Sequence, residues 1–348
     1  MRKIQISFLL ISILLFACNN EIKISPEKIK MDIDTISINY GYDLKDVVQF
    51  EDKYIIQNDD SYEGDPEFTV LDRNFKIDEK LSKSLNFKDY YFQSIWVTND
   101  TLYANDLDYF SNDSIVKHRK YFFTLKTKKW ILESEKTTKR KFYSSLNFDL
   151  DIPIFEDTFY RIRAISSGEF GGSVYFFDKK TKKTFACPSY STKNIFKINK
   201  SYFIINSLAH MGGSTEIYKI DDPQKMYLIK DKEQIENSSW AYNQETYKTI
   251  KGCFNGVKTI IDTFDIMTTA SFVRNNNIYC IYSDGKKTFL GFVKDKKIIK
   301  IKKILDKVTY YSKIRNIKSN PNLFPIRSRE INGFYIIQDT VIKIISLK

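Results

Sequence analysis

The chain has 348 residues, a formal net charge of +12 at pH 7 and an aromatic share of 15%. This length allows one large core or two domains. With only two histidines the chain has no histidine-rich metal site, and its excess lysines, scattered through polar turns, indicate a solvated surface rather than a nucleic-acid partner.

Residues 1–17 have the pattern of a secretory signal peptide. Arg2 and Lys3 precede an apolar run that is too short to cross a bilayer, since a spanning helix needs ~20 residues. The run ends in Leu15-Phe16-Ala17-Cys18, which resembles the lipobox of bacterial lipoproteins, although Phe16 is larger than the usual residue there. The resemblance implies that the Cys18 thiol receives a diacylglycerol, so that acyl chains such as palmitate anchor the mature protein. The alternatives are an ordinary cleaved signal peptide and a buried N-terminal strand with a structural cysteine.

The polar residues 18–30, which begin with the lipidated cysteine, then serve as a tether. The residue after Cys18 is Asn19 rather than aspartate, so the inner-membrane retention signal of some bacterial lipoproteins is missing. We therefore expect a protein of the bacterial cell envelope, held at the outer membrane rather than the inner one. Cleavage before Cys18 leaves a net charge of +10.

From residue 31 onward, short runs of β-branched and aromatic residues alternate with polar turns, and helical periodicity is scarcely visible. Paired apolar runs joined by two to four polar residues are typical of β-hairpins. Such pairs occupy 47–57, 94–105, 195–206 and 272–284. A second unit of strand, tight turn and strand follows several of them, at 67–77, 121–132, 174–185, 216–229 and 288–301. Together they predict an all-β chain of repeated four-stranded units, which is typical of a β-propeller.

Two matching segments support this repeat. Residues 170–178 and 211–221 place the same Gly-Gly-Ser before the same kind of strand, 41 residues apart. We expect both loops to join the second and third strands of neighbouring blades and to lie on one face of the disc.

The two ends of the chain predict how the ring closes. Residues 329–348 supply about three strands, and residues 31–40 supply a spare one. Pairing them would complete a sixth blade and leave no open sheet edge. Residues 231–262 fit no blade cleanly, as an irregular insertion or a degenerate seventh blade, and we favour six.

In this strand rhythm, over residues 31–348, the chain resembles lipid-anchored six-bladed β-propellers of TolB-like or NHL-like architecture. The resemblance implies the architecture alone, because propellers carry many unrelated activities. The mature chain keeps Cys187, Cys253 and Cys280, so at most one internal disulfide can form.

Candidate ligand-binding residues gather around the Gly-Gly-Ser motifs. Arg161 and Arg163 alternate on the strand that leads to the first motif, and arginine pairs suit carboxylate or sulfate. We expect both His118 and His210 in loops between second and third strands, with Glu169 near His210. The motif serines Ser173 and Ser214 complete the set. The alternative is that these side chains pair among themselves.

Two further segments carry possible ligand groups. Asp59, Asp60, Glu63 and Asp65 could hold Ca²⁺, but their spacing does not match an EF-hand and an ordinary solvated turn is favoured. Trp96, Tyr103, Tyr109 and Phe110 could stack on a sugar, and Tyr109, which falls in a predicted loop, is the candidate we retain. No cofactor or metal is expected.

The motifs of common hydrolases, nucleotide-binding enzymes and zinc enzymes are absent from the sequence. We therefore favour a non-catalytic binding propeller for a glycan or protein. The alternative is a carbohydrate-active enzyme, a glycoside hydrolase or lyase, with two facing carboxylates such as Glu169 and an acid of 59–65. A third hypothesis is a structural or immunity-type partner of a secreted protein.

Overall fold

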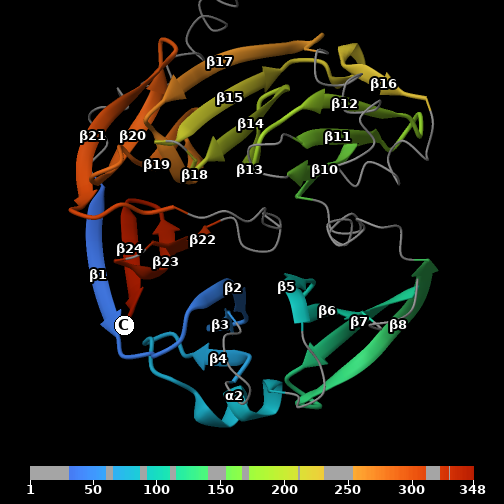
Figure 1. The fold of residues 1–348 in the computed structure, drawn as a ribbon, viewed down its shortest axis with the longest axis vertical. Helices are drawn as coiled ribbons and strands as arrows, with labels where there is room; N and C mark the ends of the chain where they lie inside the picture. Colours follow the sequence, from blue (N-terminus) through green and yellow to red (C-terminus); the bar gives the residue numbers. More distant parts are fainter. Residues whose placement is uncertain are drawn as a thin grey trace, which may run out of the picture.

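The protein is a six-bladed β-propeller, which confirms the fold predicted from the sequence. The computed structural model describes residues 31–59, 66–86, 92–109, 115–139, 154–166, 172–210, 212–230, 254–310, 322–328 and 330–348. Six sheets stand round a common axis, with their first strands towards the centre (Figure 1).

The blades are numbered in chain order, and their strands run from the axis outwards. Blade 1 contains β2 (Leu44–Phe50), β3 (Lys53–Asn58) and β4 (Phe68–Leu71), and blade 2 contains β5 (Phe92–Thr98), β6 (Thr101–Tyr109), β7 (Ile115–Thr124) and β8 (Lys129–Lys139). Blade 3 contains β9 (Phe155–Glu156), β10 (Tyr160–Ser166), β11 (Gly172–Asp178), β12 (Thr184–Pro188) and β16 (Tyr227–Ile229). Blade 4 contains β13 (Thr192–Ile198), β14 (Ser201–Leu208), β15 (Ser214–Ile220) and β17 (Val257–Phe264), and blade 5 contains β18 (Met267–Arg274), β19 (Asn277–Ser283), β20 (Thr288–Lys294) and β21 (Lys297–Leu305). Blade 6 contains β22 (Leu323–Arg327), β23 (Asn332–Gln338), β24 (Val341–Leu347) and β1 (Asp32–Ile38).

Short polar turns join the strands. Asn99 and Asp100 both have positive φ between β5 and β6, and Asn275 and Asn276 do the same between β18 and β19. Two positive-φ residues make the mirror-image turns whose twist matches that of the flanking strands, and asparagine and aspartate tolerate them well. The polar pairs read from the sequence are therefore tight hairpin turns.

The chain termini close the ring, as the sequence predicted. β1 pairs with β24 over seven residues, from Asp32 opposite Val341 to Ile38 opposite Leu347. The pairing is parallel, whereas every other strand pair of the described residues is antiparallel. On the inner side of blade 6, Tyr310 bridges to Arg327 and extends the sheet towards the axis.

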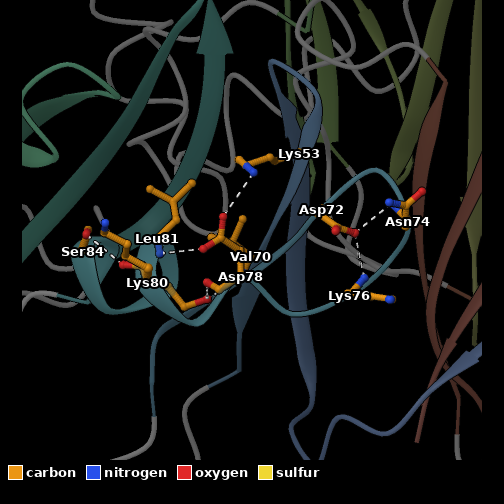
Figure 2. Close-up of polar contacts among 10 residues, drawn as sticks. Lys53, Val70, Asp72, Asn74, Lys76, Asp78, Lys80, Leu81 and Ser84 are labelled. Carbon is orange, nitrogen blue, oxygen red and sulfur yellow. Dashed lines mark hydrogen bonds and ion pairs between the residues drawn. The ribbon is translucent and has the colours of Figure 1, made fainter.

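Blade 1 ends in a helix rather than a full fourth strand. After β4, a single bridge joins Leu71 to Ile77, and the chain then enters α2 (Glu79–Leu85). The Asp78 carboxylate accepts a hydrogen bond from the Leu81 amide (3.0 Å) and an ion pair from Lys53 (3.1 Å), as Figure 2 shows. This N-cap satisfies an amide that would otherwise lack a partner.

One predicted strand pair is wrong. The sequence placed residues 216–229 in one blade as two paired strands, but β15 and β16 are separated by a 3-10 turn, η6 (Pro223–Lys225), capped by Asp222. That turn carries the chain back to blade 3, where β16 pairs with β12. The fourth strand of blade 4 is instead β17, which includes the end of the segment expected as an insertion; residues 231–253 lie outside the described residues.

Buried apolar clusters hold neighbouring blades together. They join blades 1 and 2, 3 and 4, 4 and 5, 5 and 6, and 6 and 1. In the described part of the chain, no such cluster joins blade 2 to blade 3. Cys187 and Cys280 are buried free thiols, so they do not form a disulfide, and Cys253 lies outside the described residues. No helix among the described residues is long and apolar enough to span a membrane.

The first strands define two different faces of the disc. Contacts between the starts of β2 and β5, and between the starts of β13 and β18, place these beginnings on one face, which we call the entry face. The second strand of each blade ends on that face. The Gly172 carbonyl accepts a hydrogen bond from the Ser189 amide just before β13, so both Gly-Gly-Ser motifs adjoin the entry face, as predicted.

Candidate functional site

The two predicted arginines lie away from the Gly-Gly-Ser loops. Arg161 starts β10 at the face opposite the entry face, where its Nε is 3.5 Å from the Glu156 carboxylate. Arg163 stands in the middle of β10, opposite Tyr175. Because Ile162 between them faces blade 4, alternation turns both arginines towards blade 2. Glu169 lies outside the described residues, so its predicted approach to His210 stays a prediction.

The remaining candidates are dispersed over the entry face and its strands. His210 is exposed between β14 and β15, and its carbonyl accepts a hydrogen bond from the Gly213 amide. Ser214 begins β15, and its carbonyl accepts from the Ser207 hydroxyl (3.0 Å). Ser173 is buried in β11. Tyr109 ends β6 rather than lying in a loop.

The predicted position of the other histidine is wrong. His118 lies inside β7, paired with Leu107 and Lys136, and not in a loop. The polar residues around it suggested a loop, but β7 pairs with β6 on one side and with β8 on the other over most of its length.

Gly213 explains why the second motif needs glycine. Its φ is +94°, and a Cβ there would stand 2.1 Å from the Met267 side chain. Gly212 also has a positive φ, of +97°. The two glycines allow the loop to turn tightly against blade 5, so the motif has a structural role at this position.

Of the acidic loop residues, only Asp59 is described, and it is engaged. It forms an ion pair with Arg327, whose other nitrogen lies 2.8 Å from Asp43. This clamp joins blade 6 to blade 1. Trp96 and Tyr103 stack with centroids 5.5 Å apart, and Lys120 Nζ lies 4.4 Å from the centre of the Tyr103 ring. In the described residues, no group of three histidine, cysteine, aspartate or glutamate side chains is arranged to hold a metal ion.

A feature that sequence analysis missed repeats on the entry face. In blades 1, 2, 4 and 5 the first strand is bulged near its start, at the second residue in blades 1, 2 and 4 and at the third in blade 5, and the bulged residue has no partner in the ladder. These residues are Lys45, Gln93, Lys193 and Thr269. A bulge inserts one residue and redirects side chains, and bulges are enriched beside functional sites.

Side chains at or directly after three of these four bulges connect neighbouring blades. Lys45 Nζ donates to the Phe92 carbonyl of blade 2 (2.8 Å), and Thr269 Oγ1 donates to the Thr309 carbonyl of blade 6 (2.9 Å). In blade 4 the residue after the bulge has this role, since Asn194 Nδ2 donates to the Ser271 carbonyl of blade 5 (2.8 Å). Side chains at the bulges therefore connect the inner strands of adjacent blades.

Lys193 is engaged differently. The residue is half-buried, and its amine donates to the Ser191 hydroxyl (2.8 Å), within its own segment, and has no other polar partner in the described residues. Burial lowers the pKa of Lys193 to about 7. Ser191 itself has φ of +35°, a conformation that costs energy for a residue with a side chain.

Hydroxyl and amide groups surround this corner. The Asn206 carbonyl oxygen accepts hydrogen bonds from Ser189 (2.7 Å) and Thr192 (3.2 Å). The Asn206 Nδ2 is buried and has no hydrogen-bond partner in the described residues. We call Ser189, Ser191, Thr192, Lys193 and Asn206 the blade-4 corner. Lys193 is half-buried and the other four residues are almost fully buried, so Lys193 is the residue of the corner that is exposed enough to meet a ligand. Its amine and the unused Asn206 donor suit an anionic, hydroxyl-bearing ligand.

Comparisons with known proteins add little beyond this geometry. No family model matches the chain, and no curated protein matches it. Among solved structures, the β-propeller domain of the Trilobed protease from Pyrococcus furiosus is 10% identical, with a TM-score of 0.36 over 89% of this chain and 86% of that chain. The GH93 α-L-arabinofuranosidase of Fusarium graminearum is 12% identical, with a TM-score of 0.33 over 85% of this chain and 91% of that one. The α-L-arabinanase of Cellvibrio cellulosa is 9% identical, with a TM-score of 0.35 over 74% and 95%. Similarity at this level does not bear on the function of this chain.

Proposed function

We propose that this protein is an exported, lipid-anchored binding propeller that holds a glycan or protein ligand on its entry face without transforming it. The observation that carries the proposal is the blade-4 corner, where a half-buried lysine and several hydroxyl and amide groups gather at the inner end of one blade. Loops and strand ends on a rigid scaffold are where binding residues concentrate.

The anchor is proposed from the sequence. Residues 15–18 match the lipobox pattern except at Phe16, and the short tether of 18–30 would keep the disc close to the bilayer. Asn19 after the cysteine supports residence at the outer membrane.

The anchor predicts a clear effect of Cys18→Ser. In a bacterial host fed labelled palmitate, the wild type should carry the label and partition with membranes, since acyl chains supply ~0.8 kcal/mol per buried CH₂. The variant should carry no label and leave the membrane fraction. Cys253→Ser, which leaves the lipobox intact, is the matched control. Equal labelling of Cys18→Ser and wild type would contradict the anchor.

Ligand binding is tested with residues 19–348, which include every described residue. A glycan array and a pull-down from envelope extract should retain a ligand that is recovered unchanged. Retention followed by release of new reducing ends would contradict the non-catalytic role and favour a sugar-cleaving enzyme, which needs two carboxylates roughly 5–10 Å apart. An array and pull-down with no retained ligand would contradict the binding role itself.

A further inference from the structure

We infer that Lys193 is the ligand-binding cation of the entry face and that it binds the carboxylate of an acidic saccharide. The inference rests on the proposed binding function and names its residue and its ligand class.

The first argument is the placement of the amine. Ladder pairing passes from Thr192–Asn206 to Asn194–Ile205, which leaves Lys193 as the inserted residue of the innermost strand of blade 4. Asn194 already connects this blade to blade 5. Lys193 is therefore not needed for that connection, and its amine contacts only a serine hydroxyl among the described residues.

The second argument is the charge around the amine. On β13 itself, Lys197 lies at the far end of the strand and pairs with Asp157. On β14 the ionisable group is Tyr202, which donates to that same Asp157. No carboxylate among the described residues pairs with the Lys193 amine, so the amine gains an ion pair when an anionic ligand arrives.

The other two strands packed against β13 carry arginines. Arg274 lies at the far end of β18 and donates to the Asp339 carbonyl (2.7 Å). Arg161 and Arg163 on β10 face blade 2, as described above. Burial is the only cause that lowers the pKa of Lys193, to about 7, so a bound carboxylate would restore its charged form.

The third argument concerns the kind of anion. One amine supplies one positive charge, which matches a single carboxylate better than a doubly charged phosphate. The surrounding serine and threonine hydroxyls and the Asn206 amide are almost fully buried, and among the described residues the Asn206 Nδ2 has no hydrogen-bond partner. A sugar hydroxyl that enters the corner would accept a hydrogen bond from this donor. A sugar acid presents a carboxylate and hydroxyls together.

The test is calorimetric titration of residues 19–348 with tri-galacturonic acid, using neutral galactotriose and tri-alanine as comparison ligands. At about pH 6 we expect binding of the acidic sugar alone, and Lys193→Met should weaken it by about ten- to a hundredfold, the value of one hydrogen bond to a charged group. Lys200→Met is the matched control. Lys200 is exposed on the turn at the other end of the same hairpin, and its loss should leave affinity unchanged.

Proton uptake separates a direct role from a structural one. At about pH 8 the free amine is mostly neutral, so titrations in two buffers of different ionisation enthalpy should show about 0.9 proton taken up per bound ligand. Lys193→Arg, whose side chain stays charged, should bind with no proton uptake and with an affinity that does not change between about pH 6 and 8.

Three results would overturn the inference. They are equal affinity of Lys193→Met and wild type, no binding of tri-galacturonic acid, and preference for tri-alanine, which would mean a peptide carboxylate. If the array retains some other ligand, the proposed function stands and only this inference fails. If nothing is retained in either experiment, both fail.

Discussion

Blades 1 and 4 both have a β-bulge at the second residue of the first strand, but the bulged lysine makes a different contact in each. In each, a lysine is inserted at the second residue of the innermost strand, on the entry face. Lys45 is 9% exposed and donates to the Phe92 carbonyl of the next blade, whereas Lys193 is half-buried and, among the described residues, donates to Ser191 of its own segment alone.

The difference shows that a β-bulge on the first strand can either connect two blades or leave a side chain to bind a ligand. In blade 1 the bulged lysine itself reaches the next blade, and Gln57 donates to the same carbonyl (2.5 Å). In blade 4 the following residue, Asn194, makes that connection. Once a neighbour holds the blades together, the inserted lysine is available to bind a ligand.

The largest expected difference is in stability. Lys45→Met should lower the free energy of unfolding by about 2 kcal/mol, the value of a hydrogen bond to a charged group. Lys193→Met should not lower it, because burial depresses the pKa of the Lys193 amine and this amine therefore opposes folding at neutral pH. Urea unfolding of the two variants and the wild type measures both values. Equal losses would remove the contrast between the two corners.

The second expected difference is in pH dependence. The pKa of Lys193 is lower in the folded state, about 7, than the ~10.4 of an unfolded lysine, so between these values the unfolded chain binds more protons and stability rises with pH. From about pH 7 to 8.5 this group should add up to about 1.5 kcal/mol, less where water reaches the amine. The window ends there because Cys187 and Cys280, whose pKa values burial raises to about 12, oppose the trend at higher pH.

Unfolding of wild type and Lys193→Met across that pH range checks this prediction. The wild type should gain stability relative to the variant as pH rises. Parallel curves would mean that the amine titrates at its ordinary pKa.

A smaller effect on stability is expected at the bulge of blade 5. Thr269→Val keeps the shape of the side chain and removes the hydrogen bond to the Thr309 carbonyl. We expect a loss of about 1 kcal/mol, since the donor is neutral, which is less than for Lys45. Thr263→Val, an exchange in the outer strand β17, should cost less in the same urea-unfolding assay. A larger loss at Thr263 than at Thr269 would contradict the role of the inner corners.

The architecture could be predicted from the sequence because it depends on patterns that repeat. Strand rhythm, polar turn pairs and the spare strand at residues 31–40 all follow from alternation and from the need to close a sheet edge. The Gly-Gly-Ser motifs were placed correctly for the same reason: Gly213 adopts a φ that only glycine takes easily.

The bulges on the entry face, including the blade-4 corner, could not be predicted from the sequence in the same way. A bulge depends on backbone pairing, and the inserted residues are two lysines, a glutamine and a threonine, which share no type. A weaker signal was present in the second strands, where Asn58, Asp106 and Asn206 place a buried polar residue opposite the start of three of the four bulges. The arginines attracted attention through their chemistry, yet alternation alone could not tell which neighbouring blade they face.

The pairing of β16 with β12 could not be predicted from the local sequence pattern either. Residues 216–229 have the composition of a hairpin, and only the capped turn at Asp222 and Pro223 sends the second strand to another blade. Strand partners beyond the hairpin depend on which sheet edge is free, and that is a property of the whole fold.

The most direct test of the account is the pKa of Lys193 in the intact protein. Competitive labelling with trace acetic anhydride, read by mass spectrometry over a pH series, reports the fraction of neutral amine at each lysine. The account predicts that Lys193 is labelled with a midpoint near pH 7, which moves upward when tri-galacturonic acid is added. A midpoint near the ~10.4 of an unperturbed lysine, unchanged by the ligand, would contradict it.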